Sequence, residues 1–212
     1  TELFESTGTD KTLSGNTVLH YHKLLSSILT TAVRWQVIPS NPCERVAPPK
    51  VERKEAVYLD EEQAADLLAA LDKESMQHQV IVKLLLFTGM RRGELCGLEW
   101  KDIDFERAVI TVRRSSLYMA ERGVFTDDTK NASSERCMKV SADVVAMLKA
   151  WRAEQSKQRL RMGDQWQDSD RLFTTWNGAP IRPDGITAWF HKFVTKNGLP
   201  PIHIHSLRHT NA

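Results

Sequence analysis

A polar, proline-containing stretch from Cys43 to Ala56 limits what this chain can fold into. It carries two consecutive prolines, shows no apolar rhythm, and holds a cluster of charged side chains between Lys50 and Glu55. Such a composition is typical of a linker, because prolines interrupt regular structure and the charged groups remain solvated. We therefore expect a domain boundary near residue 55, with residues 1–55 and 56–212 forming separate parts.

The part before the boundary contains one convincing helix, over residues 14–37. Apolar residues recur there at spacings of three and four, and Asn41-Pro42 follows the helix. A single helix cannot bury a core of its own. We therefore expect residues 1–55 to be a piece of a larger helical domain.

The part after the boundary is predicted to be mainly α with a small antiparallel β-sheet, an α+β fold. Asp60 and Gln63 form a capping-box pattern for a helix that runs to about Leu71. The segment 76–87 is apolar on most sides, which predicts a buried helix. The other predicted elements are helices over 91–98, 141–151, 184–194 and from 205 onward and strands over 108–112, 116–119, 137–140 and 172–174. Gly123 and the polar segment 126–135 are expected to connect the strands 116–119 and 137–140.

Composition excludes several classes of protein. Hydrophobic residues make up 41% and charged residues 26%, as in ordinary globular domains. The longest apolar run is too short to span a membrane, and the first residues lack the features of a signal peptide. Three widely spaced cysteines without a CxxC pair argue against a disulfide scaffold, so a cytoplasmic protein is expected.

The charge is unevenly distributed, although the net charge is only +2. Residues 59–104 hold 5 basic and 10 acidic side chains, whereas residues 149–212 hold 10 basic and 5 acidic ones. This asymmetry is compatible with one basic face that binds a polyanion. Chance patterning of a solvated surface explains it equally well.

The first candidate site is the sequence TGMRRGEL at residues 88–95. Gly89 permits a tight turn, and Arg91 then stands at the start of a helix, where its guanidinium and unpaired backbone N–H groups suit a phosphate. Glu94 lies three residues further on the same helical face and is placed to hold Arg91. A surface ion pair after a loop is the alternative.

Two further clusters carry chemistry. Lys130 lies in a polar segment between predicted strands, where a lysine can donate a proton or simply be solvated. His205, Arg208 and His209 fall on one predicted helical face, a pattern that can grip and protonate oxyanions. Zinc binding by His203, His205 and His209 is an alternative, but no HExxH glutamate is present and Arg208 would repel a dication. No phosphate-binding Walker loop, GxGxxG or GxSxG sequence occurs.

Taken together, these clusters resemble the tyrosine recombinases, the phage integrase family. Residues 88–104 look like the family's first arginine box, TGxRxxEL followed by L.W.DID, and HSLRH at 205–209 matches its H-x-L-R-H box. Lys130 stands where the family has its hairpin lysine. Residues 14–50 are similar to the end of the family's core-binding domain. The resemblance implies a tyrosine-recombinase catalytic domain over 56–212, preceded over 1–55 by the C-terminal part of the helical core DNA-binding domain and the linker.

The resemblance also implies roles for individual residues. Arg91 and Arg208 would clamp the non-bridging oxygens of the scissile phosphate, since planar guanidinium forks match a pentavalent transition state. Lys130 would be the general acid toward the leaving 5′-oxygen, and His205 would assist proton transfer. Glu94 and His209 would orient these groups. No metal is expected, because the arginines and the lysine supply the positive charge. No ATP or other cofactor is expected either, because a 3′-phosphotyrosine link conserves the energy of the broken bond.

The chain departs from the family pattern at the nucleophile. The family places its reactive tyrosine after the H-x-L-R-H box, whereas Tyr21, Tyr58 and Tyr118 all precede it. We therefore expect a fragment of a longer recombinase, truncated before the nucleophile, that binds DNA without cutting it.

The partner implied by the resemblance is a double-stranded DNA attachment site, with Lys50, Arg53 and Lys54 of the linker as phosphate contacts; a solvated linker explains those three equally well. The full-length protein would act as a tetramer on DNA, and the free chain is expected to be a monomer. Two other classes of function stay open: an inert recombinase-like DNA-binding regulator, and a zinc-dependent hydrolase.

Overall fold

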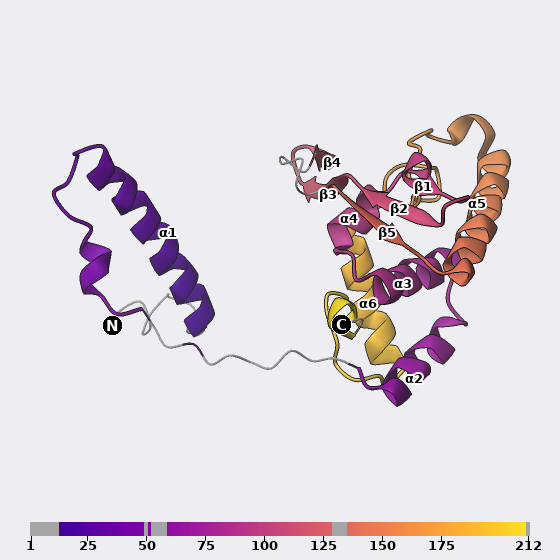
Figure 1. The fold of residues 1–212 in the computed structure, drawn as a ribbon, viewed down its shortest axis with the longest axis horizontal. Coiled ribbons are helices and arrows are strands. Elements are labelled where there is room, and N and C mark those ends of the chain that lie inside the picture. The colour runs from indigo at the N-terminus through magenta and orange to yellow at the C-terminus, as the bar shows by residue number, and fades with distance from the viewer. Residues whose placement is uncertain (1–12, 49–50, 52–58, 129–134, 211–212) are drawn as a thin grey trace. The chain divides into compact units, whose positions relative to one another are not determined.

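The computed structural model describes residues 13–48, 51, 59–128 and 135–210, without the side chains of Asp128, His209 and Thr210. The chain divides into two compact units, Thr1–Glu55 and Ala56–Ala212. Figure 1 shows both, and each is described by itself.

The first unit is built on one long helix, α1 (Gly15–Arg34), followed by a 3-10 helix, Pro42–Arg45. The Ser14 side chain caps α1 by accepting a hydrogen bond from the backbone N–H of Thr17. The predicted helix ended at residue 37. The observed one ends earlier, because the backbone of Gln36 adopts a positive φ of 60°.

Asn41 fastens the short 3-10 helix of this unit to α1. Its side-chain amide donates to the backbone carbonyl of Ser26 (3.1 Å) and to the hydroxyl of Thr30 (3.0 Å). Among the residues described, α1 still exposes a row of large apolar side chains: Tyr21, Leu24, Leu25 and Ile28.

The second unit is organised around the buried helix α3 (Met76–Thr88). Six consecutive or near-consecutive apolar residues between Val80 and Leu86 are buried, which confirms the expectation that this helix is apolar on most sides. Its neighbours in space include α4, α5 and α7. The other helices of the unit are α2 (Glu61–Leu71), α4 (Arg92–Gly97), α5 (Ala142–Met162), α6 (Pro183–Lys196) and α7 (Leu207–Thr210).

The strands form two small antiparallel sheets, so the predicted fold class is confirmed but the single expected sheet is not. One sheet has the order β1 (Ile103–Asp104), β2 (Val109–Val112), β5 (Arg136–Lys139). The other is a hairpin of β3 (Arg114–Met119) and β4 (Gly123–Asp128).

Strand β4 was expected to be a polar connection. Its second half, Thr126–Asp128, is polar, and the strand pairs along its length with β3, from Arg114 opposite Asp128 to Met119 opposite Gly123. Most described residues of the two strands are only half-buried, and burial does not alternate strictly along them, which explains why the pattern did not reveal this hairpin. The strand expected over 172–174 consists only of isolated bridges, Glu99 to Arg171 and Thr174 to Pro180.

Helix α5 begins where expected, with Ser141 as its cap, but continues to Met162 rather than ending at Trp151. Beyond Trp151 only Gln155 is buried, so no apolar rhythm marks the last three turns. Trp151 itself is buried and donates its indole N–H to the carbonyl of Leu172 (2.8 Å). This contact holds α5 against the chain segment that leads to α6.

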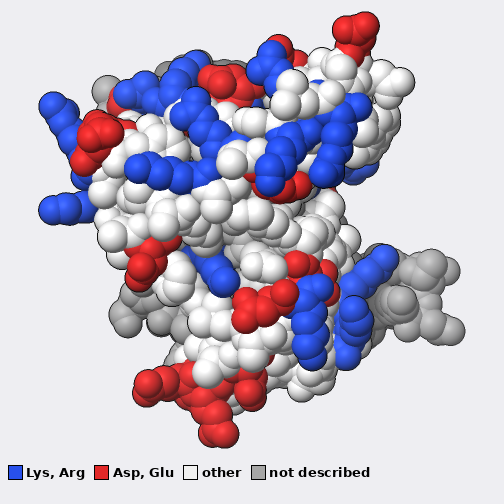
Figure 2. Space-filling model, turned by 90° about the vertical axis from the view of Figure 1, so that its right-hand side faces the viewer, with Lys and Arg blue, Asp and Glu red and all other residues white. Residues whose placement is uncertain are grey.

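Charged side chains are unevenly placed on one face of the second unit (Figure 2). Basic groups gather in its upper part, where α5 runs, and acidic groups gather at its lower end, at α2. The exposed basic residues of α5 are Lys149, Arg152, Lys157, Arg159 and Arg161, and the exposed acidic residues at α2 are Asp60, Glu61, Glu62 and Asp66. Among the described helices, none is long and apolar enough to cross a membrane.

Candidate phosphate-binding site

The turn between α3 and α4 presents Arg91 to solvent. Helix α3 ends at Gly89, whose φ of 59° places it in the left-handed region that glycine adopts without strain. Arg91 then stands immediately before α4, in extended conformation, and 62% of its side chain is exposed. The predicted turn and short helix are therefore present.

Glu94 holds Arg91 at two points. One carboxylate oxygen accepts a hydrogen bond from the backbone N–H of Arg91 (2.7 Å), and the other accepts from Nη1 of its guanidinium (2.9 Å). The Glu94 side chain is only 6% exposed. The contact to the side chain was predicted from the three-residue spacing, whereas the backbone contact makes Glu94 part of the cap of α4 as well.

Arg136 is a residue of this cluster that the sequence did not reveal. From the first position of β5 it donates to both carboxylate oxygens of Glu94, with Nη1 at 3.0 Å and Nη2 at 2.6 Å. This is a bidentate pair between residues 42 apart in the chain. No local spacing links the two residues, so only the fold brings them together.

These contacts keep Glu94 ionised. Burial on its own would raise the pKa of this carboxyl group, but the hydrogen bonds from Arg136 and Arg91 outweigh burial and lower the pKa from 4.5 to about 2. The same ion pair raises the pKa of Arg136. Glu94 is thus a fixed negative charge between two guanidinium groups.

Arg208 lies on α7, which packs against α3. Its Nη1 atom is buried and, within the described part of the chain, has no hydrogen-bond partner. His205 lies in the turn before α7 rather than on the helix as expected, and its backbone carbonyl accepts from the N–H of Arg208 (3.3 Å). The His205 side chain is exposed. Arg91 and Arg208 therefore come from elements that share α3 as a neighbour.

Two other arginines of this unit, Arg114 and Arg171, form hydrogen bonds and ion pairs within the protein. Arg114 pairs with Asp102 (2.5 Å) and Glu99 (3.2 Å). Arg171 donates to the carbonyl of Gly97 (2.6 Å) and lies 3.8 Å from Glu99. These buried groups connect β3 and the 171–174 segment to the end of α4, which is a structural task.

Several predicted site residues fall outside the described residues. These are Lys130 and the linker residues Lys50, Arg53 and Lys54, together with the side chain of His209. Across the described ranges, no group of three or more His, Cys, Asp or Glu side chains is arranged to hold a metal ion. That geometry gives no support to a zinc hydrolase built on His203 and His205.

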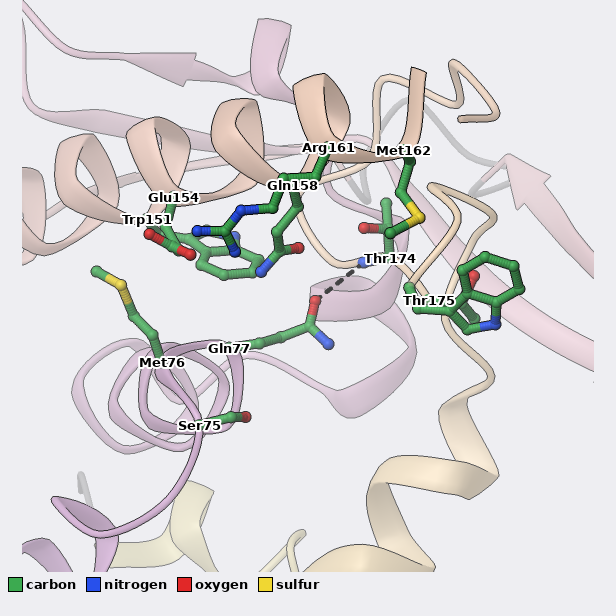
Figure 3. A pocket seen from close by; sticks show the side chains of 11 residues that line it. Ser75, Met76, Gln77, Trp151, Glu154, Gln158, Arg161, Met162, Thr174 and Thr175 are labelled. Carbon is green, nitrogen blue, oxygen red and sulfur yellow. Dashed lines mark hydrogen bonds between the residues drawn. The ribbon is translucent and has the colours of Figure 1, made fainter. Parts of the chain in front are cut away.

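A cavity of about 650 Å³ lies at the other end of α3 (Figure 3). It is bounded by the start of α3, the last turns of α5 and the loop at Thr174–Trp176, and the backbone N–H of Thr174 donates to Gln77 across it (3.2 Å). Because α3 has 13 residues, this cavity is roughly 20 Å from the Arg91 end. It contains none of the predicted site residues.

The chain can be compared with known protein families and structures. A model of the phage integrase family matches residues 57–212, which is most of the chain. The chain belongs to the phage integrase family. The predicted resemblance is confirmed at this level.

Relatives extend the match to the first unit. The ICEBs1 integrase of Bacillus subtilis (strain 168) is 25% identical over 199 residues, covering 94% of this chain and 54% of that protein. The integrase of Mycobacterium phage FRAT1 is 30% identical over 196 residues, covering 91% of this chain and 55% of that protein. The chain thus spans about half the length of these relatives.

Solved structures of the family have the same fold. The Tn1549 transposon integrase in complex with transposon right end DNA superposes with a TM-score of 0.79 at 25% identity, covering 94% of this chain and 66% of that one. The lambda integrase bound to DNA matches with a TM-score of 0.59 at 16% identity, covering 93% and 64%. The second likeness concerns the fold alone.

Proposed function

We propose that this chain is the DNA-binding and phosphate-clamping part of a site-specific DNA recombinase of the tyrosine type. In this proposal Thr1–Glu55 is the C-terminal part of the core DNA-binding domain with its linker, and Ala56–Ala212 is the catalytic domain. The substrate is a double-stranded DNA attachment site. Family membership supports the proposal, as do the similarity to the ICEBs1 integrase and the similarity to the Tn1549 integrase in complex with transposon right end DNA.

One observation carries the proposal furthest: Arg208 has a buried guanidinium nitrogen without a partner in the described part of the chain, and the exposed Arg91 leaves two guanidinium nitrogens without protein contacts. Nε and Nη2 of Arg91 have no partner among the described residues, and neither does the buried Nη1 of Arg208. For Arg208, a buried guanidinium N–H without an acceptor costs about 1–3 kcal/mol, whereas the free donors of Arg91 face solvent. A phosphate oxygen would satisfy both groups, since bidentate arginine pairing suits phosphate geometry.

The proposed chemistry assigns a role to each group. Arg91 and Arg208 stabilise the charge that develops on the phosphate oxygens in the transition state. Lys130 donates a proton to the leaving 5′-oxygen, and His205 assists proton transfer. Glu94 orients Arg91, and His209 supports the same site. The linker residues Lys50, Arg53 and Lys54 contact DNA phosphates.

The nucleophile is proposed not to be one of the described tyrosines. Tyr118 lies under the guanidinium of Arg182, 3.5 Å from its ring centroid, and Tyr21 belongs to α1 in the other unit. We therefore expect these 212 residues to form no covalent adduct with a nicked suicide duplex. An adduct that survives SDS would contradict this assignment.

DNA binding is tested by fluorescence anisotropy with a short labelled duplex at several salt concentrations. We expect affinity to fall steeply with salt, because each phosphate contact releases counterions. Arg91→Ala and Arg208→Ala should each reduce the magnitude of the salt slope by about 1. The control is Arg159→Ala, since Arg159 pairs with Asp168 on the surface of α5. If Arg159→Ala reduces the salt slope as much as the other two variants do, the DNA contacts the α5 face, and the proposed phosphate clamp is refuted.

The assembly state belongs to the same proposal. We propose that the free chain is a cytoplasmic monomer and that the full-length protein works as a tetramer on DNA. Sedimentation analysis of the free chain should give a mass near 24.2 kDa. A stable dimer without DNA would contradict the first part.

A further inference from the structure

Arg91 poses an electrostatic problem. If it binds a DNA phosphate, its positive charge must be available, yet it donates to a carboxylate that is only 6% exposed. A one-to-one ion pair is neutral overall and attracts an anion weakly. Glu94 and Arg91 alone would therefore make a poor phosphate site.

Arg136 changes this balance. It lies on β5, so it approaches Glu94 from a different element than Arg91 does. With Arg136 present, one negative and two positive charges meet at this point, and the cluster as a whole is cationic.

The two guanidinium groups are used differently. Arg136 directs both terminal nitrogens at Glu94, at 3.0 and 2.6 Å. Arg91 uses only Nη1 for its side-chain contact to Glu94, at 2.9 Å. Its Nε and Nη2 have no partner within the described ranges, and 62% of its side chain is exposed. Both terminal nitrogens of Arg136 are thus occupied by Glu94, whereas Nε and Nη2 of Arg91 remain available as donors.

We propose that Arg136 is a positioning residue for Arg91: it neutralises Glu94, so that Arg91 is held in place yet keeps its positive charge and its open edge for a phosphate. The inference rests on the proposed function of Arg91. It assigns to Arg136 a task that involves no contact with DNA. Glu94 then supplies orientation and Arg136 supplies the charge that this orientation would otherwise remove.

The test measures phosphate affinity at Arg91 directly. Inorganic phosphate is titrated into the 212-residue chain while the side-chain Nε–H signal of Arg91 is followed by NMR. Arg136→Gln should weaken phosphate binding about tenfold, because one nearby unit charge is lost. Arg136→Lys should retain most of the affinity, since it keeps the charge. Arg113→Gln is the matched control, because it removes an arginine that pairs with exposed Glu135 and does not touch Glu94.

A double variant separates charge compensation from a general structural role. In the Arg136→Gln background, Glu94→Gln removes the buried negative charge that only Arg91 would then neutralise. We expect this double variant to recover phosphate affinity relative to Arg136→Gln alone, which lost packing would not produce. Carboxyl NMR should also show a raised pKa of Glu94 in Arg136→Gln and little change in Arg113→Gln.

The outcomes are distinguishable. If wild-type Arg91 does not respond to phosphate, the proposed function fails, and the inference fails with it. If wild type binds phosphate but Arg136→Gln binds it equally well, only the inference fails. It also fails if Arg113→Gln loses as much affinity as Arg136→Gln, or if the double variant recovers nothing. Should Arg136→Gln not fold, the comparison of Arg136→Lys and the double variant with wild type decides, and weak binding by both would overturn the inference.

Discussion

The ion cluster at Glu94 should make a measurable, pH-dependent contribution to stability. The pKa of the Glu94 carboxyl group lies at about 2 in the folded protein, against 4.5 for the unperturbed group. Each unit of difference corresponds to roughly 1.4 kcal/mol, so ionised Glu94 should stabilise the fold by about 3 kcal/mol at pH 7. Glu94→Gln, which removes the charge and keeps the shape, should lower the free energy of unfolding by about that amount.

The sign of the pH dependence follows from the lowered pKa. The contribution is present above the unfolded pKa and is lost as pH falls toward the folded one. The difference in unfolding free energy between wild type and Glu94→Gln should therefore shrink to about 1 kcal/mol at pH 3. Below that, a protonated Glu94 and the introduced amide become equivalent in charge.

Urea denaturation at a series of pH values measures this difference. Five of the six tryptophans belong to the Ala56–Ala212 unit, so tryptophan fluorescence reports on the unit that contains Glu94. Glu135→Gln is the control, because its ion pair with Arg113 is half exposed on both sides and such pairs contribute about 0–1 kcal/mol. A Glu94→Gln effect that stays constant from pH 7 to pH 3 would refute the assignment of a low pKa to Glu94.

Three further predictions follow from other parts of the second unit. Gly97→Ala should destabilise the protein by about 1–3 kcal/mol, because an added Cβ would lie 2.9 Å from the backbone carbonyl oxygen of Arg114. Gly185→Ala is the control, because its Cβ would meet nothing closer than 3.9 Å. Equal urea midpoints for the two variants would contradict the packing of α4 on β3. Trp151→Ala should cost about 3–5 kcal/mol in urea denaturation, since its buried ring and its hydrogen bond to Leu172 are both lost. Burial raises the pKa of the Cys96 thiol to about 12, so Cys96 should react with a thiol reagent at pH 8 only after unfolding, whereas exposed Cys137 reacts in the native protein; peptide mapping of the labelled cysteines checks this.

The sequence predicted those parts of the fold whose cause is local. The capping box at Asp60, the buried helix α3 and the turn at Gly89 each follow from a few neighbouring residues, and all are present. Helix α5 was underestimated because its last turns are mostly exposed and carry no apolar repeat. Strand β4 was missed for a similar reason, since its half-buried and exposed residues show no strict apolar alternation.

In the candidate site, too, the contacts between residues close in sequence were predicted, and the contact between distant residues was not. The contact between Arg91 and Glu94 follows from a spacing of three residues, and Arg208 was identified by the H-x-L-R-H pattern. Arg136 was missed because its partner is 42 residues away, and pairing between a strand and a helix at that separation leaves no periodic trace. Predicting it requires the register of β2 with β5, which the sequence alone does not determine.

That register has a consequence for how this domain tolerates change. Val112 at the end of β2 is paired directly with Arg136 at the start of β5, so the polypeptide leaves the three-stranded sheet and returns to it at the same rung. Everything between these two positions, including the β3–β4 hairpin, is an excursion with adjacent ends. Insertions or deletions within it need not shift the strand that presents Arg136 to Glu94, so the arginine cluster can keep its geometry when the length of this stretch changes.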